Sequence, residues 1–161
     1  MKAVDDFARL KQEGRKISMV TAYDAWSARL VARSNVDAIL VGDSAAMVIH
    51  GHATTLAATV ELMAIHTRAV ASAAAGKFLI ADLPFLSFRK GIPAAMKAVS
   101  ALVTSGAQSV KLEGVAGHED VIRHIVESGV PVMGHIGLTP QAVNQFGGFR
   151  CRERPRTTPR S

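Results

Sequence analysis

Charged and polar side chains follow four short apolar segments of the sequence, at the point where each segment ends. Asp43, Asp82, Glu113 and His135 occupy these positions, and Lys111 lies two residues before Glu113. If the apolar segments are parallel strands, their carboxyl ends meet at one edge of the sheet, where ligand-binding loops gather. We therefore expect three carboxylates, an imidazole and an ammonium group to lie together at this edge, which we call the mouth of the site.

Three carboxylates beside a lysine suit a hard divalent cation such as Mg²⁺, which prefers oxygen ligands and keeps positions open for water or substrate. The sequence has neither a cysteine cluster nor a His-x-x-x-His pair, so zinc is disfavoured. A 2-keto acid could chelate the open positions, and the ion would stabilise the enolate left by loss of the C3 proton. Lys111 would add positive charge there, and the hydroxyl and N–H of Ser44 could meet the substrate carboxylate.

Each of these residues also has a structural interpretation. Asp43 and Asp82 could cap the helices that follow them. Lys111 and Glu113 could form a partly buried ion pair without a catalytic role. His135 could be a core histidine whose ring is satisfied by the backbone, and Ser44 could serve the turn alone. The coincidence at four strand ends favours the functional interpretation over these separate explanations.

Polar residues away from the strand ends are expected to be structural. Asp24 directly precedes a predicted helix, so we expect it to cap that helix rather than to bind a metal. The same structural or surface role is expected for the other histidines, which are His50, His52, His66, His118 and His124.

The elements that must position the site alternate between short apolar runs and longer segments of helical spacing. Strands are expected at residues 17–22, 38–41, 77–81, 109–112 and 130–134, and helices at residues 25–33, 60–75, 93–104 and 119–128. Strands that are apolar on both faces indicate a parallel sheet covered on both sides, in a barrel or a doubly wound α/β fold. No G-x-G-x-x-G follows the first strand, which disfavours a dinucleotide site. Alternation pairs Val41 with Asp43 and Ile80 with Asp82 on common faces.

Composition is that of an ordinary globular protein. The chain has 161 residues, 48% of them hydrophobic, and a single cysteine, Cys151, which excludes an intrachain disulfide framework. The N-terminus lacks the apolar region of a secretory signal, and no apolar run reaches the roughly 18 residues needed to span a bilayer. We therefore expect a cytoplasmic protein.

The net charge of +6 comes mostly from the end of the sequence. Five of the 19 Lys and Arg residues lie at 149–161 against one of the 13 acidic residues, so the rest of the chain is close to neutral. These arginines are Arg150, Arg152, Arg154, Arg156 and Arg160. Nucleic acid is therefore not the expected partner, and residues 149–161 are expected to form a disordered Arg/Pro-rich tail.

Five strings of the sequence together form a compound signature. They are VTAYDAWSARL, ILVGDSAAMVIHGHATTL, LIADLPF, VKLEG and PVMGHIGLTPQAVNQFGG. In this order and spacing, over about residues 10–149, the chain resembles the ketopantoate hydroxymethyltransferase family.

The resemblance implies a (β/α)₈ TIM barrel with Mg²⁺ held by Asp43, Asp82 and Glu113. It also implies keto-acid binding by these two aspartates together with Ser44 and Lys111, and catalytic positions for Lys111 and His135 in the pocket. The family transfers a hydroxymethyl group from 5,10-methylenetetrahydrofolate to 3-methyl-2-oxobutanoate, which gives 2-dehydropantoate for pantothenate biosynthesis. Its members form homo-oligomers, commonly decamers.

Two segments depart from the family pattern. Residues 57–59 read Ala-Ala-Thr where the family has Pro-Val-Thr, and after residue 148 the sequence takes on the character of an out-of-frame translation. We therefore expect residues 1–148 to be an incomplete barrel with about five of the eight strands. The family's general base, a glutamate, is expected beyond residue 161. On this basis the isolated chain is expected to fold poorly or to be inactive.

Two other functions remain open from the sequence. One is a Mg²⁺-dependent keto-acid lyase or mutase of the isocitrate lyase kind, which would share the barrel and the metal site. The other is an inactive fragment that binds acidic partners through its arginine-rich tail.

Overall fold

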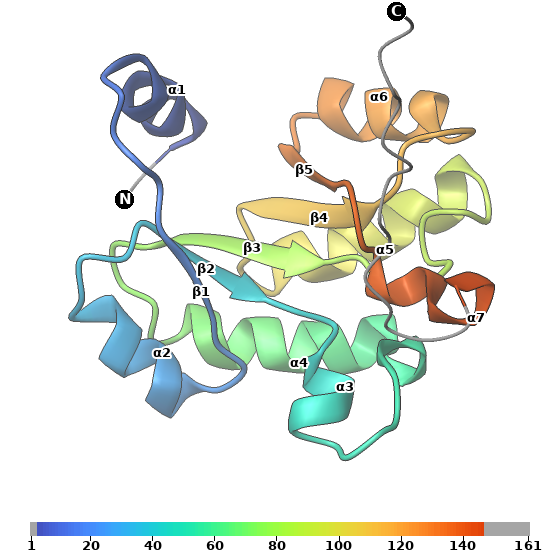
Figure 1. The fold of residues 1–161 in the computed structure, drawn as a ribbon, viewed down its shortest axis with the longest axis horizontal. Coiled ribbons are helices and arrows are strands. Elements are labelled where there is room, and N and C mark those ends of the chain that lie inside the picture. Colours follow the sequence, from blue (N-terminus) through green and yellow to red (C-terminus); the bar gives the residue numbers. More distant parts are fainter. Residues whose placement is uncertain (1–2, 147–161) are drawn as a thin grey trace, which may run out of the picture.

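The centre of the molecule is a parallel sheet of five strands, arranged in the order in which they occur in the sequence. The computed structural model describes residues 3–146. The strands are β1 (Met19–Thr21), β2 (Ala38–Val41), β3 (Phe78–Asp82), β4 (Ser109–Glu113) and β5 (Val132–His135). Each strand pairs in parallel with the next one along the chain (Figure 1). The predicted α/β fold with five parallel strands is thus confirmed.

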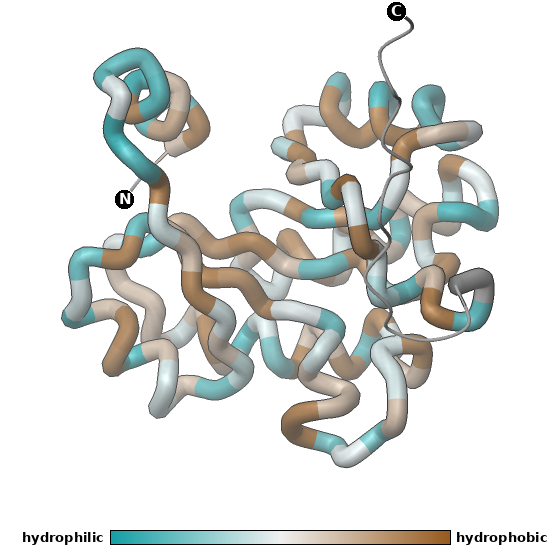
Figure 2. The backbone as a smooth tube through the Cα atoms, in the orientation of Figure 1, coloured by the Kyte–Doolittle hydropathy of each residue, from teal (hydrophilic) through white to brown (hydrophobic). Residues whose placement is uncertain are grey.

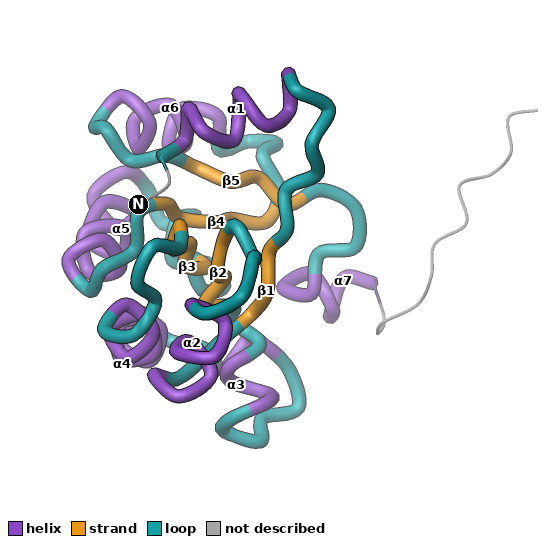
Figure 3. The backbone as a smooth tube through the Cα atoms, turned by 90° about the vertical axis from the view of Figure 1, so that its left-hand side faces the viewer, coloured by secondary structure: helices purple, strands orange, loops and turns teal. Residues whose placement is uncertain are grey.

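A helix follows each of the first four strands and packs on the outer face of the sheet. These helices are α2 (Ala25–Ala32), α4 (Val60–Ala71), α5 (Ile92–Thr104) and α6 (Glu119–Glu127). The sheet curls, with these helices around its convex side, as in part of a (β/α)₈ barrel (Figure 3). Shorter elements lie in the loops: α3 (Ala45–Val48), α7 (Val143–Phe146) and the 3₁₀ helices η1 (Thr55–Ala57) and η2 (Pro140–Ala142).

The main core lies between the helices and the convex face. Strands β2, β3 and β4 contribute aliphatic residues, and β2 and β3 carry some of the most hydrophobic stretches of the backbone (Figure 2). The helices contribute small residues that allow close approach, such as Ala28, Ala95 and Ala98. Asp24 accepts hydrogen bonds from the N–H groups of Trp26 and Ser27, each at 2.8 Å, so the predicted cap of α2 is confirmed.

The concave face carries a smaller apolar cluster. Ala38, Phe78 and Ile80 form it, and the ring of Phe7 stands edge-on to that of Phe78 with 5.0 Å between centroids. Phe7 belongs to α1 (Val4–Gln12), a helix that the sequence analysis did not anticipate. This helix therefore packs at the amino ends of the strands, opposite the predicted site.

Strand β1 departs from the sequence prediction because it is an edge of the sheet. The predicted strand at residues 17–22 is reduced to the three residues that pair with β2. All three are exposed, so the prediction that this strand is buried on both faces was wrong.

Helix α4 ends at Ala71, whereas the sequence predicted a helix as far as residue 75. The chain then turns at Gly76, which has a φ of 77°. The tail at residues 149–161 lies outside the described residues. Within residues 3–146, no helix is long and apolar enough to cross a membrane.

Two glycines with positive φ provide a matched test of the packing between α4 and α5. A Cβ at Gly106 would lie 2.5 Å from the Cβ of Ala71, whereas one at Gly76 would meet nothing within 4 Å. We expect Gly76→Ala to lower the free energy of unfolding by about 1 kcal/mol through backbone strain alone. Gly106→Ala should lower it by roughly a further 1–3 kcal/mol through overpacking. Urea unfolding measures both, and equal losses would contradict the packing described.

Candidate active site

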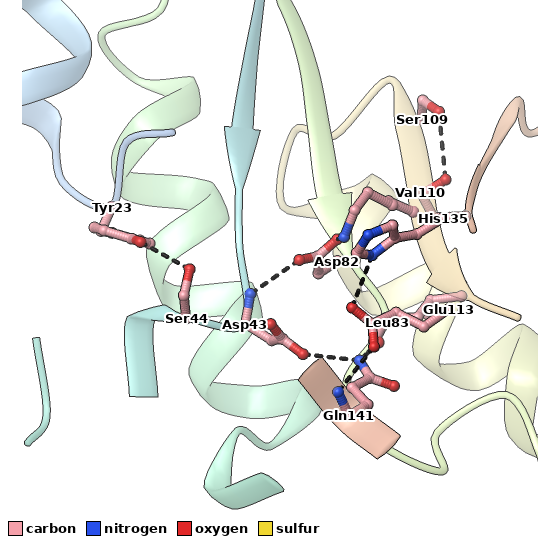
Figure 4. A network of polar contacts seen from close by, with 11 residues as sticks. Tyr23, Asp43, Ser44, Asp82, Leu83, Ser109, Val110, Glu113, His135 and Gln141 are labelled. Atoms are coloured by element: carbon pink, nitrogen blue, oxygen red, sulfur yellow. Dashed lines mark hydrogen bonds and ion pairs between the residues drawn. The ribbon is translucent and has the colours of Figure 1, made fainter. Parts of the chain in front are cut away.

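The strand ends bring the predicted polar residues together. Asp82 and Glu113 are the last residues of β3 and β4, and His135 is the last residue of β5. The register sets Asp82 opposite Lys111 and Glu113 opposite His135. The carboxylates of Asp43, Asp82 and Glu113 are all buried, with 3–4% of each residue exposed. The predicted convergence at one mouth is therefore what the structure shows (Figure 4).

Asp43 reaches this mouth by a route that strand alternation does not describe. Val41 belongs to the core under the helices, whereas Ile80 belongs to the concave cluster, so alternation alone would set Asp43 and Asp82 on opposite faces of the sheet. The turn after β2 redirects Asp43, whose backbone N–H donates to Asp82 Oδ2 at 3.1 Å. A Cβ at Gly42 would lie 2.8 Å from Ser44 Oγ, so a larger residue here would displace the Ser44 hydroxyl.

Lys111 pairs with Asp82 and not with Glu113. Its Nζ donates to Asp82 Oδ1, and only 12% of the lysine side chain is exposed. The isolated Lys111–Glu113 ion pair considered from the sequence is therefore absent among the described residues. The arrangement leaves one buried ammonium group to neutralise three buried carboxylates.

Glu113 is held from two sides. Its Oε1 lies 3.0 Å from His135 Nδ1, and its Oε2 accepts the backbone N–H of Gln141 at 2.9 Å. His135 is therefore oriented by a carboxylate rather than by the backbone, and its side chain is 31% exposed at the mouth. The alternative of a core histidine satisfied by the backbone does not hold.

Gln141 is the site residue that the sequence analysis missed. Its Nε2 donates to Asp43 Oδ2 at 2.8 Å and to the carbonyl of Leu83 at 3.0 Å. Because its backbone also binds Glu113, this residue of η2 joins the ends of β2 and β4 across the mouth (Figure 4). The GLTPQ string that carries the resemblance contains Gln141, which was the available signal.

Ser44 faces a tyrosine rather than a helix terminus. Its Oγ lies 2.8 Å from the hydroxyl of Tyr23, and it makes no capping bond to α3. The carbonyl of Tyr23 is in turn bound by His66 Nδ1 at 2.7 Å, and His66 Nε2 lies 2.8 Å from His50 Nε2. These two histidines connect the loop after β2 to α4, in agreement with the structural role expected of them.

Comparison with known sequences now identifies the family. The ketopantoate hydroxymethyltransferase family matches residues 1–160. The chain belongs to this family. A member from Bdellovibrio bacteriovorus, named 3-methyl-2-oxobutanoate hydroxymethyltransferase, is 56% identical over 154 residues, which cover 96% of this chain and 59% of that protein. The chain thus spans less than two thirds of the length of the curated relatives it matches.

Solved structures agree at the level of the fold. A 2,3-dimethylmalate lyase, a member of the PEP mutase/isocitrate lyase superfamily, superposes with a TM-score of 0.62 at 16% identity, over 83% of this chain and 53% of that chain. A phosphonopyruvate hydrolase in complex with oxalate and Mg²⁺ superposes with a TM-score of 0.56 at 17% identity, over 68% of this chain and 38% of that chain. The hydroxymethyltransferase family member therefore shares its fold with these barrel enzymes.

Burial dominates the electrostatics of the site. It raises the pKa of Asp43 from 3.8 to about 6, with further increases from the charges of Asp82 and Glu113, while Gln141 and Lys111 act in the opposite direction. Burial also raises the pKa of Asp82, in spite of the opposing effect of Lys111. The mouth therefore carries more buried negative charge than its own cations compensate.

This excess charge and the oxygen donors fit a hard divalent cation. As the side chains stand, no three His, Cys, Asp or Glu residues among residues 3–146 are close enough together to hold a metal. Each carboxylate instead has a protein partner: Gln141 on Asp43, Lys111 on Asp82, and His135 on Glu113. Asp43, Asp82 and Glu113 would hold the ion by exchanging these contacts for it.

The raised pKa of Asp43 predicts a specific dependence of stability on pH. The folded chain retains this proton up to about pH 6, whereas the unfolded chain loses it near pH 3.8. Ionisation of Asp43 therefore costs the folded state up to about 3 kcal/mol as the pH rises from about 4 to 7. Asp43→Asn removes this cost while retaining an acceptor for Gln141. In urea unfolding with EDTA, the variant should match the native chain near pH 4 and exceed it in stability at pH 7. A difference between the two proteins that does not change with pH would contradict the assignment.

Proposed function

We propose that this chain forms the metal- and keto-acid-binding site of a 3-methyl-2-oxobutanoate hydroxymethyltransferase. The reaction would join the one-carbon unit of 5,10-methylenetetrahydrofolate to C3 of 3-methyl-2-oxobutanoate, with water supplying the hydroxyl oxygen. Its products would be 2-dehydropantoate and tetrahydrofolate, on the route to pantothenate. The observation that carries the proposal is the convergence of Asp43, Asp82, Glu113 and Lys111 at one mouth, in a chain 56% identical to a relative of this name.

Asp43, Asp82 and Glu113 would hold Mg²⁺, which is also bound with oxalate in the fold relative described above. When bound, the ion polarises the carbonyl of a chelating 2-keto acid and stabilises the enolate. The raised pKa of Asp43 supports this role, because a divalent cation would compensate the negative charge that raises it.

The remaining residues would bind and orient the keto acid. Lys111, largely buried beside Asp82, would place an ammonium group near the substrate oxygens and stabilise negative charge on them. The Ser44 hydroxyl, fixed by Tyr23, would bind the substrate carboxylate. His135, oriented by Glu113 and partly exposed, would line the pocket and move a proton at its imidazole.

Binding measurements test the site directly. Calorimetry should show saturable binding of 3-methyl-2-oxobutanoate in Mg²⁺ and none in EDTA. Asp82→Asn should abolish the dependence on Mg²⁺, and Lys111→Ala should weaken keto-acid binding about tenfold or more. Asp120→Asn on α6 and Lys97→Ala on α5 are exposed matched controls that should bind as the native chain does. Equal affinity with and without Mg²⁺ would overturn the proposed metal site.

The transfer reaction needs its own assay. The chain is incubated with 3-methyl-2-oxobutanoate, methylenetetrahydrofolate and Mg²⁺, beside a metal-free control. Mg²⁺-dependent formation of 2-dehydropantoate would extend the proposal to catalysis by these 161 residues. Keto-acid binding without product would restrict the proposal to substrate binding.

A Mg²⁺-dependent lyase or mutase is the second candidate, because the fold relatives include a 2,3-dimethylmalate lyase. That likeness, at 16% identity, concerns the fold alone, whereas the hydroxymethyltransferase relative is 56% identical. Cleavage of a 2-alkylmalate without folate would favour the lyase. The basic tail considered as a binding segment lies outside the described residues.

Exposed apolar side chains on α2, α3 and α4 support self-association. Trp26 is 71% exposed, Val48 is 65% exposed and Ile65 is 61% exposed. These residues would lie in contacts between copies of the chain in a homo-oligomer, which in the family is commonly a decamer. Light scattering should therefore give a mass above 17.0 kDa, and Trp26→Ser should lower it. An unchanged mass in the variant, or a monomer at the outset, would exclude this surface.

A further inference from the structure

A line of close polar contacts runs from the surface of the molecule to Ser44. His50 lies in the loop after β2 and His66 lies on α4, and their Nε2 atoms are 2.8 Å apart. The Nδ1 atom of His66 is 2.7 Å from the carbonyl oxygen of Tyr23, whose hydroxyl is 2.8 Å from Ser44 Oγ (Figure 4). Three separate segments of the chain are thus linked, and the line ends beside Asp43.

The partners of His66 determine which of its ring nitrogens carries the proton. A carbonyl oxygen can only accept, so His66 Nδ1 must donate to Tyr23. In the neutral ring Nε2 then has a lone pair and can only accept, so His50 Nε2 must be the donor. His50 therefore fixes the tautomer of His66. In the opposite tautomer, a lone pair of Nδ1 would face the Tyr23 carbonyl at the same 2.7 Å.

His66 is held in this orientation by its surroundings. Only 9% of the residue is exposed, whereas His50 lies at the surface. The His66 ring stands at a steep angle to both neighbouring rings, with centroids 5.1 Å from that of His50 and 6.5 Å from that of Tyr23. A buried ring nitrogen that loses its partner is poorly compensated by water. An incorrect tautomer would therefore weaken the contact with Tyr23.

Tyr23 joins the histidines to Ser44 because its main chain and its hydroxyl serve different partners. His66 holds the carbonyl, and the next residue, Asp24, is fixed as the cap of α2. The hydroxyl then lies on one side of Ser44 Oγ. On the other side, a Cβ at Gly42 would lie 2.8 Å from the same oxygen. The Ser44 hydroxyl is therefore confined between Gly42 and Tyr23.

We propose that His50, His66 and Tyr23 are positioning residues that direct the hydroxyl proton of Ser44 toward the substrate carboxylate, an inference that rests on the proposed function. A carboxylate only accepts, so the Ser44 hydroxyl must donate to it. The Ser44 oxygen then accepts from the Tyr23 hydroxyl, which excludes the reverse direction of that bond. These three residues form a donor series that begins at the surface and fixes the direction of the last hydrogen bond.

The tautomer is tested by nitrogen-15 NMR on the full chain labelled at histidine, in alkaline buffer where imidazoles are neutral. His66 should carry its proton on Nδ1 in the native chain. In His50→Ala the proton should be shared between both nitrogens. His50→Gln, whose amide can donate to His66 Nε2, should restore the native pattern. His124→Gln on the exposed side of α6 is the control and should leave the signal unchanged. A proton on His66 Nε2 in the native chain would refute the proposal.

Calorimetry with 3-methyl-2-oxobutanoate and Mg²⁺ tests whether the donor series acts through Ser44. Tyr23→Phe and His50→Ala should each raise the Kd about fivefold to tenfold. In a Ser44→Ala background neither change should have a further effect, because the proton that the series directs is absent. Equal effects in both backgrounds would show that these residues act on the fold alone, and the proposal would then be wrong.

Two substitutions separate the roles of the two His66 nitrogens. The amide of His66→Asn lies near the place of Nδ1 and can donate to Tyr23, whereas the amide of His66→Gln reaches the place of Nε2. His66→Asn should therefore retain most of the keto-acid affinity, and His66→Gln should lose about tenfold. Thermal unfolding checks that both variants fold, and the reverse order of affinities would contradict the proposal. If His66→Gln does not fold, the Tyr23 and His50 variants decide.

Mg²⁺ binding to the chain alone is measured on the same samples. The hydrogen bonds described for the donor series involve none of Asp43, Asp82 and Glu113, so Mg²⁺ affinity should be unchanged in every variant of the series. Absence of keto-acid binding in the native chain would overturn the proposed function. Native binding without coupling to Ser44 would instead overturn the donor series, so the two failures are distinguishable.

Discussion

The burial of three carboxylates with a single ammonium group is the interaction on which the site depends. Asp43, Asp82 and Glu113 are each almost completely withdrawn from water, where an ionised carboxylate is strongly disfavoured unless it is paired or hydrogen-bonded. Lys111 and the amide of Gln141 provide part of the compensation. The negative charge that remains uncompensated gives the site a raised affinity for positive charge. In the free chain this charge is supplied by protons, and in the function proposed here by a divalent cation.

The fold brings these groups together through the register in which its parallel strands pair. Pairing of β3 with β4 and of β4 with β5 sets acidic and basic residues opposite each other at the strand ends. The apolar residues before them anchor the strands under the helices, so the polar groups are held by rigid elements and not by loops alone. The loop after β3 and the segment after β5 then line a hollow beside Glu113.

The sequence predicted correctly those elements that depend on the spacing of apolar residues and on nearby capping residues. Strands β2 to β5 and helices α2, α5 and α6 lie within about two residues of their predicted positions, because apolar runs and caps such as Asp24 are local signals. The convergence of Asp82, Lys111 and Glu113 also followed from a general property of parallel sheets.

Features that depend on contacts between residues distant in the sequence could not be predicted. The direction of Asp43 depends on a turn at Gly42 and not on strand alternation, and Gln141 reaches Asp43 from 98 residues away. The exposure of β1 follows from its place at the sheet edge, which no pattern within residues 17–22 reveals. Helix α1 has its contact at Phe78, seventy-one positions along the chain from Phe7, so its docking has no local signature.

The agreement between strand order and sequence order has a consequence for synthesis. Each strand pairs with the one made immediately before it, so a growing chain can add one strand and its helix to a sheet that already exists. Among the five described strands, none has to wait for a partner made later than its neighbour, and the search for pairing stays local at every stage. The carboxylates enter the mouth one after another during this growth, and Gln141 arrives last. Asp43 and Glu113, at the ends of β2 and β4, therefore lack their hydrogen bonds to Gln141 until the ribosome has released η2.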